Sequence, residues 1–318
     1  PGAQLSLSSG THNFLASSSL TGDAFTFSGG TVNMAGTYNI GGTTTVSGGN
    51  NSLAGATVLD IGDTLVISGG SLDLGALAPS ITTYTQSGGT LNGTGTVTVS
   101  GASTMGSVVG ATTTMTGAGT TRFDGAFAVI GSGVHDFTAG RTLLTTGTTT
   151  WTNAAGNDGQ IRFGGNARIE NQGTWLDNTS VNTSINPNLG GGSFTNTVSG
   201  VYQKNTATTV TISSQFNNDG LVDILAGSLT LTGGGTHNGD FVFAPGAQLN
   251  LSGGTHNFLA TSSLTGDAFT FSGGTVNMGG TYDISGSTTV TGGNNSLVGA
   301  TVLDIGDTLV ISGGSLDL

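Results

Sequence analysis

Apolar and polar residues alternate along most of this chain, in short runs that end at paired glycines. A Ser-Gly-Gly motif or a close variant begins at Ser8, Ser28, Ser47, Ser68 and Ser87. The residues one position before the motif are mostly apolar: Leu7, Phe27, Val46, Ile67 and Gln86. Alternation with a period of two is typical of a strand buried on one face, and no stretch keeps the i, i+3, i+4 spacing of a helix. The pattern therefore predicts strands of about 4–6 residues joined at glycine corners.

The motif recurs about every 20 residues, and a unit of that size cannot bury its own apolar face. It has to stack on copies of itself, which is the principle of a solenoid. We therefore expect an all-β fold, a right-handed parallel β-helix (β-solenoid) with about 20 residues per coil. The right-handed winding follows from the general chirality of parallel crossovers.

A second, longer repeat shows that the chain is a length of an array. Residues 245–318 repeat residues 1–74 without a gap, and nine of the 74 aligned positions differ, as at Ser6/Asn250 and Ala54/Val298. The tandem unit is thus 244 residues long (1–244), and 245–318 begin the next copy. We expect 1–318 to form one continuous β-solenoid, whose coils continue through Pro245.

The middle of the unit departs from this rhythm and is the best candidate for recognition. The segment 177–193 is polar and carries Pro187, so we expect a loop that protrudes from the rod. Both tryptophans and all five cations of the chain lie between 122 and 204. A partner could be contacted through 150–205, by Trp151, Arg162, Arg168, Trp175 and Asp177.

Composition and charge narrow the classes of partner. The net charge is −12 at pH 7, so nucleic acid is not expected, because binding it requires a basic face. There is no cysteine, and no apolar run is long enough to cross a membrane, so membrane insertion is not expected either. The partners we expect are further copies of the same unit, in the same chain or end-to-end and side by side in a fibre.

Few residues suggest chemistry. The best carboxylate pair is Asp60 and Asp63, which returns as Asp304 and Asp307. We interpret them as solvated turn acids, with Ca²⁺ as a weakly supported alternative because Ca²⁺ needs six or more oxygen ligands. His237 and His256 are 19 residues apart and should stack in adjacent coils. We find no catalytic motif and expect neither an enzyme nor a cofactor.

The stretch from Phe216-Asn217-Asn218-Asp219-Gly220-Leu221 to Leu229-Thr230-Leu231-Thr232-Gly233-Gly234-Gly235-Thr236-His237 resembles the repetitive shafts of very large bacterial surface adhesins. These are filamentous-haemagglutinin-like or autotransporter-like β-solenoids. The resemblance covers nearly the whole chain and is one of composition and period. It implies a secreted fibre on the bacterial cell surface.

The function we expect is therefore that of a non-catalytic, extracellular fibre or stalk segment. One alternative is an adhesive module that binds glycans or other fibres through 150–205. A lesser alternative is an ice-binding solenoid, because Thr43-Thr44-Thr45, Thr112-Thr113-Thr114 and Thr148-Thr149-Thr150 could present regular hydroxyl arrays.

Overall fold

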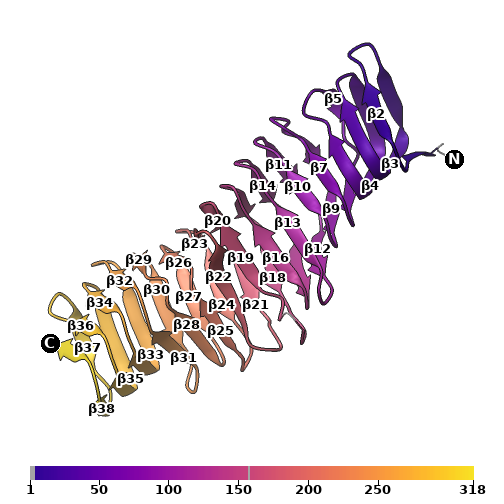
Figure 1. Cartoon of the computed structure of the whole chain (residues 1–318). Helices are drawn as coiled ribbons and strands as arrows, with labels where there is room; N and C mark the ends of the chain where they lie inside the picture. The colour runs from indigo at the N-terminus through magenta and orange to yellow at the C-terminus, as the bar shows by residue number, and fades with distance from the viewer. Residues whose placement is uncertain (1–3, 157) are drawn as a thin grey trace.

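A computed structural model of the chain is an elongated rod of stacked coils, with the N-terminus at one end and the C-terminus at the other (Figure 1). It describes residues 4–156 and 158–318. All named strands of this part pair in parallel, in about 15 turns of about 21 residues each. The predicted all-β parallel β-solenoid is confirmed.

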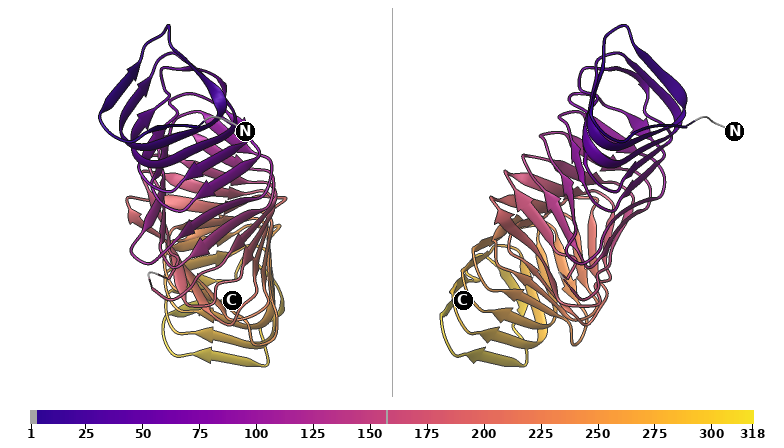
Figure 2. Two further views of the ribbon diagram at one scale, coloured as in Figure 1. Left: turned by 90° about the vertical axis from the view of Figure 1, so that its right-hand side faces the viewer. Right: turned by 45° about the vertical axis from the view of Figure 1, so that its right-hand side comes forward.

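Each coil has three faces, and the strands of each face form a ladder along the rod (Figure 2). The first face consists of β8 (Ser80–Ile81), β11 (Thr96–Val99), β14 (Thr120–Phe123), β17 (Thr142–Thr145), β20 (Ala167–Asn171), β23 (Gly192–Asn196), β26 (Gln215–Asn218), β29 (Gly235–His237), β32 (Thr255–Phe258), β34 (Thr275–Met278), β36 (Asn294–Ser296) and β39 (Ser315–Asp317).

From the coil of β6 onward, the second face runs to β37. It consists of β6 (Thr64–Ile67), β9 (Thr83–Gln86), β12 (Ser103–Ser107), β15 (Phe127–Gly131), β18 (Thr148–Trp151), β21 (Thr174–Asp177), β24 (Val201–Lys204), β27 (Leu221–Ile224), β30 (Asp240–Phe243), the first parts of β33 (Ser263–Phe271) and β35 (Thr281–Val290), and β37 (Thr301–Asp304).

The third face completes each coil. It consists of β7 (Ser71–Asp73), β10 (Thr90–Asn92), β13 (Thr112–Met115), β16 (Val134–Phe137), β19 (Ile161–Gly164), β22 (Thr183–Leu189), β25 (Thr209–Ile212), β28 (Ser228–Leu231), β31 (Gln248–Leu251), the second parts of β33 and β35, and β38 (Thr308–Ile311).

The first coils are built from β1 (Gln4–Leu7), β2 (Thr11–Phe14), β3 (Ser19–Met34), β4 (Thr37–Ser52) and β5 (Thr57–Asp60). Both β3 and β4 are long because each of them continues around the corners of a coil and contributes to three ladders. At the other end of the unit, β28 pairs with β31, so strand pairing passes through Pro245 without a break.

The period-two alternation of the sequence separates the core from the surface. In β25, Val210 and Ile212 are buried, while Thr209 and Thr211 are partly exposed. The same pattern in successive coils joins the inward side chains into one hydrophobic cluster along the axis. Because strands in a ladder lie about 4.8 Å apart, every inward side chain packs on the coils before and after it.

Glycine at the corners is required by both backbone conformation and space. Gly49 has φ +76°, which disfavours any side chain, and a methyl group there would overlap the carbonyl oxygen of Gly30 in the preceding coil. Gly41 has no such restriction, because a methyl group there would meet open space. Consistent with this, the second copy carries Ser285 at the position of Gly41 and keeps Gly293 at that of Gly49.

The two copies of the repeat are turned relative to each other by one face. The Thr-Leu-Val-Ile sequence of β6 returns as β38, but the ladder that contains β6 ends with β37. β38 belongs to the third face, and β39, which repeats β7, belongs to the first. One 244-residue unit thus makes whole turns plus one face, and identical strands of successive units lie on different sides of the rod.

We predict that Gly49→Ala destabilises the rod far more than Gly41→Ala. The left-handed conformation alone should cost about 1–3 kcal/mol, and the overlap with Gly30 should add to it. Gly41→Ala should stay within about 0.5 kcal/mol of the parent. Urea unfolding followed by circular dichroism measures both changes. Equal midpoints for the two variants would show that the Ser-Gly-Gly corners do not need glycine.

Candidate functional site

The two tryptophans lie inside the rod and not on its surface. Trp151 and Trp175 are both fully buried, with ring centroids 6.3 Å apart. Trp175 also packs edge-to-face on Phe194, which stacks on Phe216 in the next coil. The prediction that these tryptophans contact a partner is wrong, because β18 and β21 point them into the core.

The polar segment 177–193 is not a protruding loop. Its residues 183–189 form β22, which pairs with β19 and β25, and Ile185 is fully buried. Its exposed residues are Ser180, Asn182, Asn188, Leu189 and Gly190, on either side of the buried middle. The loop prediction is therefore wrong for most of this segment. Hydrogen bonds within the coil accommodate its polar residues. Asn186, for example, accepts a hydrogen bond from the backbone N–H of Asn188 and donates one to the Ser184 hydroxyl.

The two arginines of the candidate site lie on different faces. Arg162 of β19 makes a two-pronged ion pair with Asp136, through Nε at 2.7 Å and Nη2 at 2.8 Å. Arg168 of β20 pairs with Glu170 at 2.6 Å and is half exposed. The five residues predicted to contact a partner thus point inward or onto two separate faces, and they do not form one contact surface.

Asp177 instead belongs to a polar cluster inside the rod, together with Tyr202 and Lys204. All three side chains are fully buried, and Asp177 pairs in register with Lys204 on the neighbouring strand. The Lys204 Nζ lies 3.9 Å from Asp177 Oδ2, and the Tyr202 hydroxyl donates to the same oxygen at 2.9 Å. Thr179 donates to Oδ1 through its backbone N–H and its hydroxyl.

Burial sets the protonation tendencies of this cluster. It raises the pKa of the Asp177 carboxyl, although Lys204 and the hydrogen bonds from Thr179 and Tyr202 oppose the shift. It also lowers the pKa of Lys204, against the attraction of Asp177. Both groups are thereby shifted toward their neutral forms, as desolvation requires. The sequence reading missed Tyr202 and Lys204, although the alternation in Val201-Tyr202-Gln203-Lys204 places both on the inward side.

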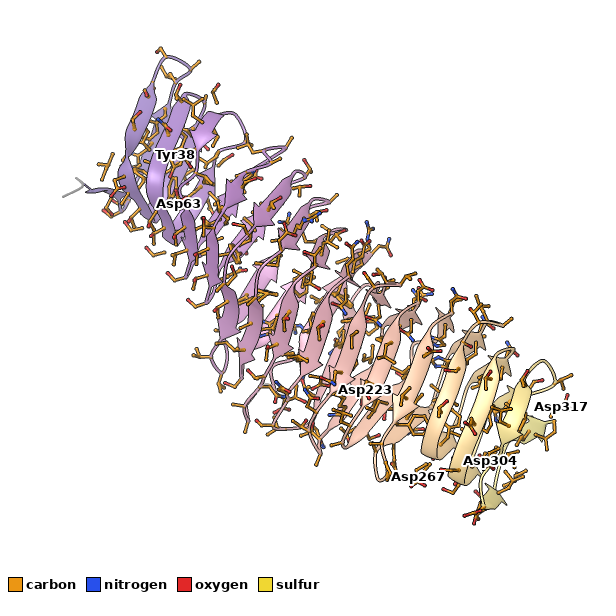
Figure 3. All side chains as sticks on the ribbon, turned by 180° about the vertical axis from the view of Figure 1, so that it is seen from behind. Tyr38, Asp63, Asp223, Asp267, Asp304 and Asp317 are labelled. Carbon is orange, nitrogen blue, oxygen red and sulfur yellow. The ribbon has the colours of Figure 1, made fainter. Side chains whose placement is uncertain are left out.

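The acidic pairs lie at exposed corners. Asp60 and Asp304 each accept a hydrogen bond from a backbone N–H two residues on, at Gly62 and Gly306, which is the role of a turn acid. Figure 3 shows Asp63 near the N-terminal end of the rod and Asp304 near the other end, so the two copies do not combine. Within residues 4–156 and 158–318, no three His, Cys, Asp or Glu residues gather as metal ligands would.

A shallow groove of about 420 Å³ lies beside Asp60, where β5 has no strand partner on its far side. Val58, Leu59, Leu77 and Pro79 line it. Pro79 has no backbone N–H to donate, so the chain cannot extend the β5 ladder at this point. The groove carries a single acidic side chain, which is not sufficient for acid–base chemistry by a pair of groups.

The threonine triplets do not form a continuous hydroxyl grid. Their central members, Thr44, Thr113 and Thr149, are fully buried. On the outer side, Thr150 pairs with Ala128 in one neighbouring coil and with Leu176 in the other. The regular surface that an ice-binding solenoid would need is interrupted here.

The predicted histidine stack is present in the core. His256 Nε2 lies 3.0 Å from the carbonyl oxygen of Gly253 and must donate to it, since a carbonyl can only accept. His256 Nδ1 then accepts from His237 Nε2, 3.1 Å away. His237 Nδ1 is left as a buried lone pair without a partner, which fits a neutral ring. His237 also packs on Phe241 and Phe258.

Comparisons with protein-family models, with curated proteins and with solved structures gave no match. In the part of the chain that the structure describes, no helix is long and apolar enough to span a membrane.

We predict that mild acid weakens the rod through its buried histidines. Burial lowers the pKa of His135 and of His256 to about 4, and that of His237 well below its usual value. Because the unfolded chain binds protons first, the stability these histidines contribute is fully present above about pH 6.5 and is lost as the pH falls toward 4. His135 and His256 should each contribute up to about 3 kcal/mol over this window.

Urea midpoints measured between pH 7 and pH 4.5 check this dependence. The control is His256→Val, because Val276 occupies the equivalent position of the next coil. This variant should show a smaller loss of stability in acid than the parent. A parent midpoint that stays constant over this range would contradict the prediction.

Proposed function

We propose that this chain is a length of a tandem array that forms a stiff, non-catalytic fibre or stalk segment outside the cell. The sequence repeat and the continuous ladders support this proposal, because each added unit extends the same rod. The resemblance to the shafts of large bacterial surface adhesins supports the extracellular location and the cell-surface role.

One comparison within the molecule carries the proposal. Leu65 in β6 is fully buried, whereas Leu309, its equivalent in β38, is 40% exposed because no coil follows it in the structure. At the other end, Leu249 is fully buried and its equivalent Leu5 is 46% exposed. The same local sequence is thus buried where coils lie on both sides of it and exposed where it has one neighbour.

The surface of the rod supports a mechanical role better than an adhesive one. The aromatic residues that a glycan-binding platform would use are in the core at Trp151 and Trp175. The arginines are engaged by Asp136 and Glu170. The backbone ladders and the apolar axis, in contrast, continue from coil to coil, so their contribution to stiffness grows with length.

We predict that arrays of one, two and three units form rods whose length increases by a constant step. At strand spacing, the step should be on the order of 55 Å per 244-residue unit, with an unchanged diameter. Electron microscopy and small-angle X-ray scattering measure the length and the cross-section. Separate compact particles joined by linkers, or lengths that do not add, would contradict the proposal.

A matched pair of substitutions tests whether covering by the next coil is what stabilises a coil. Leu65→Asp places a carboxylate in the core and should cost more than about 3 kcal/mol. Leu309→Asp changes the same residue in the same local sequence and should cost less than about 1 kcal/mol. When another unit follows Leu318, the second substitution should become as costly as the first. Urea midpoints of both variants, each with and without the added unit, are compared with those of the matching parent chains. Equal costs of the two substitutions in the 318-residue chain would contradict the prediction.

A further inference from the structure

The buried pair of Asp177 and Lys204 joins two consecutive coils at their inner side. Asp177 ends β21 and Lys204 ends β24, and the two residues are direct neighbours in the parallel ladder. Neither side chain is accessible to solvent. Lys204 is the one lysine in the sequence, and its Nζ lies 3.9 Å from Asp177 Oδ2 without a closer contact to the carboxylate. The arrangement is therefore a close amine–carboxyl contact in a dry core and not a tight ion pair.

Hydrogen-bond donors surround the carboxyl group on both oxygens. The backbone N–H and the hydroxyl of Thr179 donate to Oδ1 at 3.2 and 2.8 Å. Two donors fixed on one oxygen are the arrangement that stabilises negative charge as it develops on a carbonyl oxygen. The Tyr202 hydroxyl donates to the other oxygen, Oδ2, at 2.9 Å. A proton donor thus stands at the oxygen that faces Lys204.

Oxygen acceptors of Thr206 and Thr208 hold the amine. Lys204 Nζ donates to the Thr206 carbonyl at 3.1 Å and to the Thr208 hydroxyl at 3.0 Å. The Thr206 hydroxyl is a longer third contact, at 3.4 Å. A neutral amine has two N–H groups for the two shorter bonds and a lone pair that is not used by them. Desolvation shifts the pKa of Lys204 downward and that of Asp177 upward, which favours the neutral amine and the neutral acid. These are the forms that can react with each other.

We propose that Asp177 and Lys204 condense to an amide, so that a covalent bond staples the coil of β21 to the coil of β24. The Nζ lone pair attacks the Asp177 carboxyl carbon and a C–N bond forms, while charge develops on Oδ1 against the Thr179 donors. Oδ2, which carries the proton of the neutral acid, takes a second proton from Tyr202, and the phenol is restored by a proton that Nζ releases. The C–O bond then breaks and Oδ2 leaves as water. The neutral amine and the neutral acid lose two hydrogens and one oxygen in total, so no other reactant is needed.

The amide would link the two ends of a long coil. The coil between Thr174 and Val201 is longer than the coil between Thr64 and Thr83, so it orders more chain for the same axial rise. A covalent link across this coil limits how far it can open under tension. The inference is independent of the proposed fibre role, since an uncrosslinked rod could still act as a fibre.

The mass of the purified 318-residue chain tests the proposal directly. Formation of the amide lowers the mass by one water, about 18 Da, which denaturing mass spectrometry resolves. Trypsin requires a free cationic side chain, so cleavage after Lys204 should also be lost. Digestion should then give one peptide from Ile169 to Leu318, lighter by one water, in place of two peptides that separate at Lys204.

Two variants assign the bond and its chemistry. Lys204→Arg keeps the cation but removes the nucleophilic amine, so it should show the full mass and normal cleavage at position 204. Tyr202→Phe removes the proton donor, and we expect condensation about a hundredfold slower, seen as an uncrosslinked fraction that declines during incubation. A parent chain that keeps its full mass after days at neutral pH, and is cut after Lys204, would overturn the proposal. The length of the arrays would be unaffected by that result.

Discussion

The structure depends on the stacking of coils that cannot be stable alone. A coil of about 21 residues forms its backbone hydrogen bonds with its neighbours and covers its apolar side chains with theirs. Stability is therefore a property of the contact between coils, and a position that faces inward is defined by the residues above and below it. The glycine corners, such as Gly49 on Gly30, follow from the same closeness, since consecutive backbones leave no room for a side chain there.

Stacking also explains how this core accommodates polar groups. Asn171 donates to Asn196 and Asn196 donates to Asn218, because identical side chains at strand spacing can bond to one another along the axis. Arg141 is buried without a carboxylate, and its guanidinium donates to the Gly93 carbonyl and the Thr121 hydroxyl. Burial lowers its pKa to about 10, so it remains charged at neutral pH. Such groups satisfy one another across coils, which an isolated coil could not do.

The sequence predicts the fold well and the candidate site poorly, and both results come from the same rule. Period-two alternation and the anchor spacing identify the strands, the core positions and the coil length. Applied to Thr174-Trp175-Leu176-Asp177, the rule places Trp175 and Asp177 inside, as observed. The polarity of the segment 177–193 favoured an exposed loop instead. Sequence alone does not show that Tyr202 and Lys204 lie across the ladder from Trp175 and Asp177, because that pairing depends on the length of the coil between them.

Because successive units are turned by one face, a partner that approaches a long array from the side meets a surface that changes from unit to unit. A surface feature of one unit, such as the corner that bears Asp63, reappears on the next unit turned by one face about the rod axis. It returns to the same ladder only after three units. Such a filament has a screw-like surface lattice with a longer repeat than its sequence. A flat neighbour that lies along one ladder would therefore meet three different sequences in turn, and a ring around the filament would meet all of them at every level.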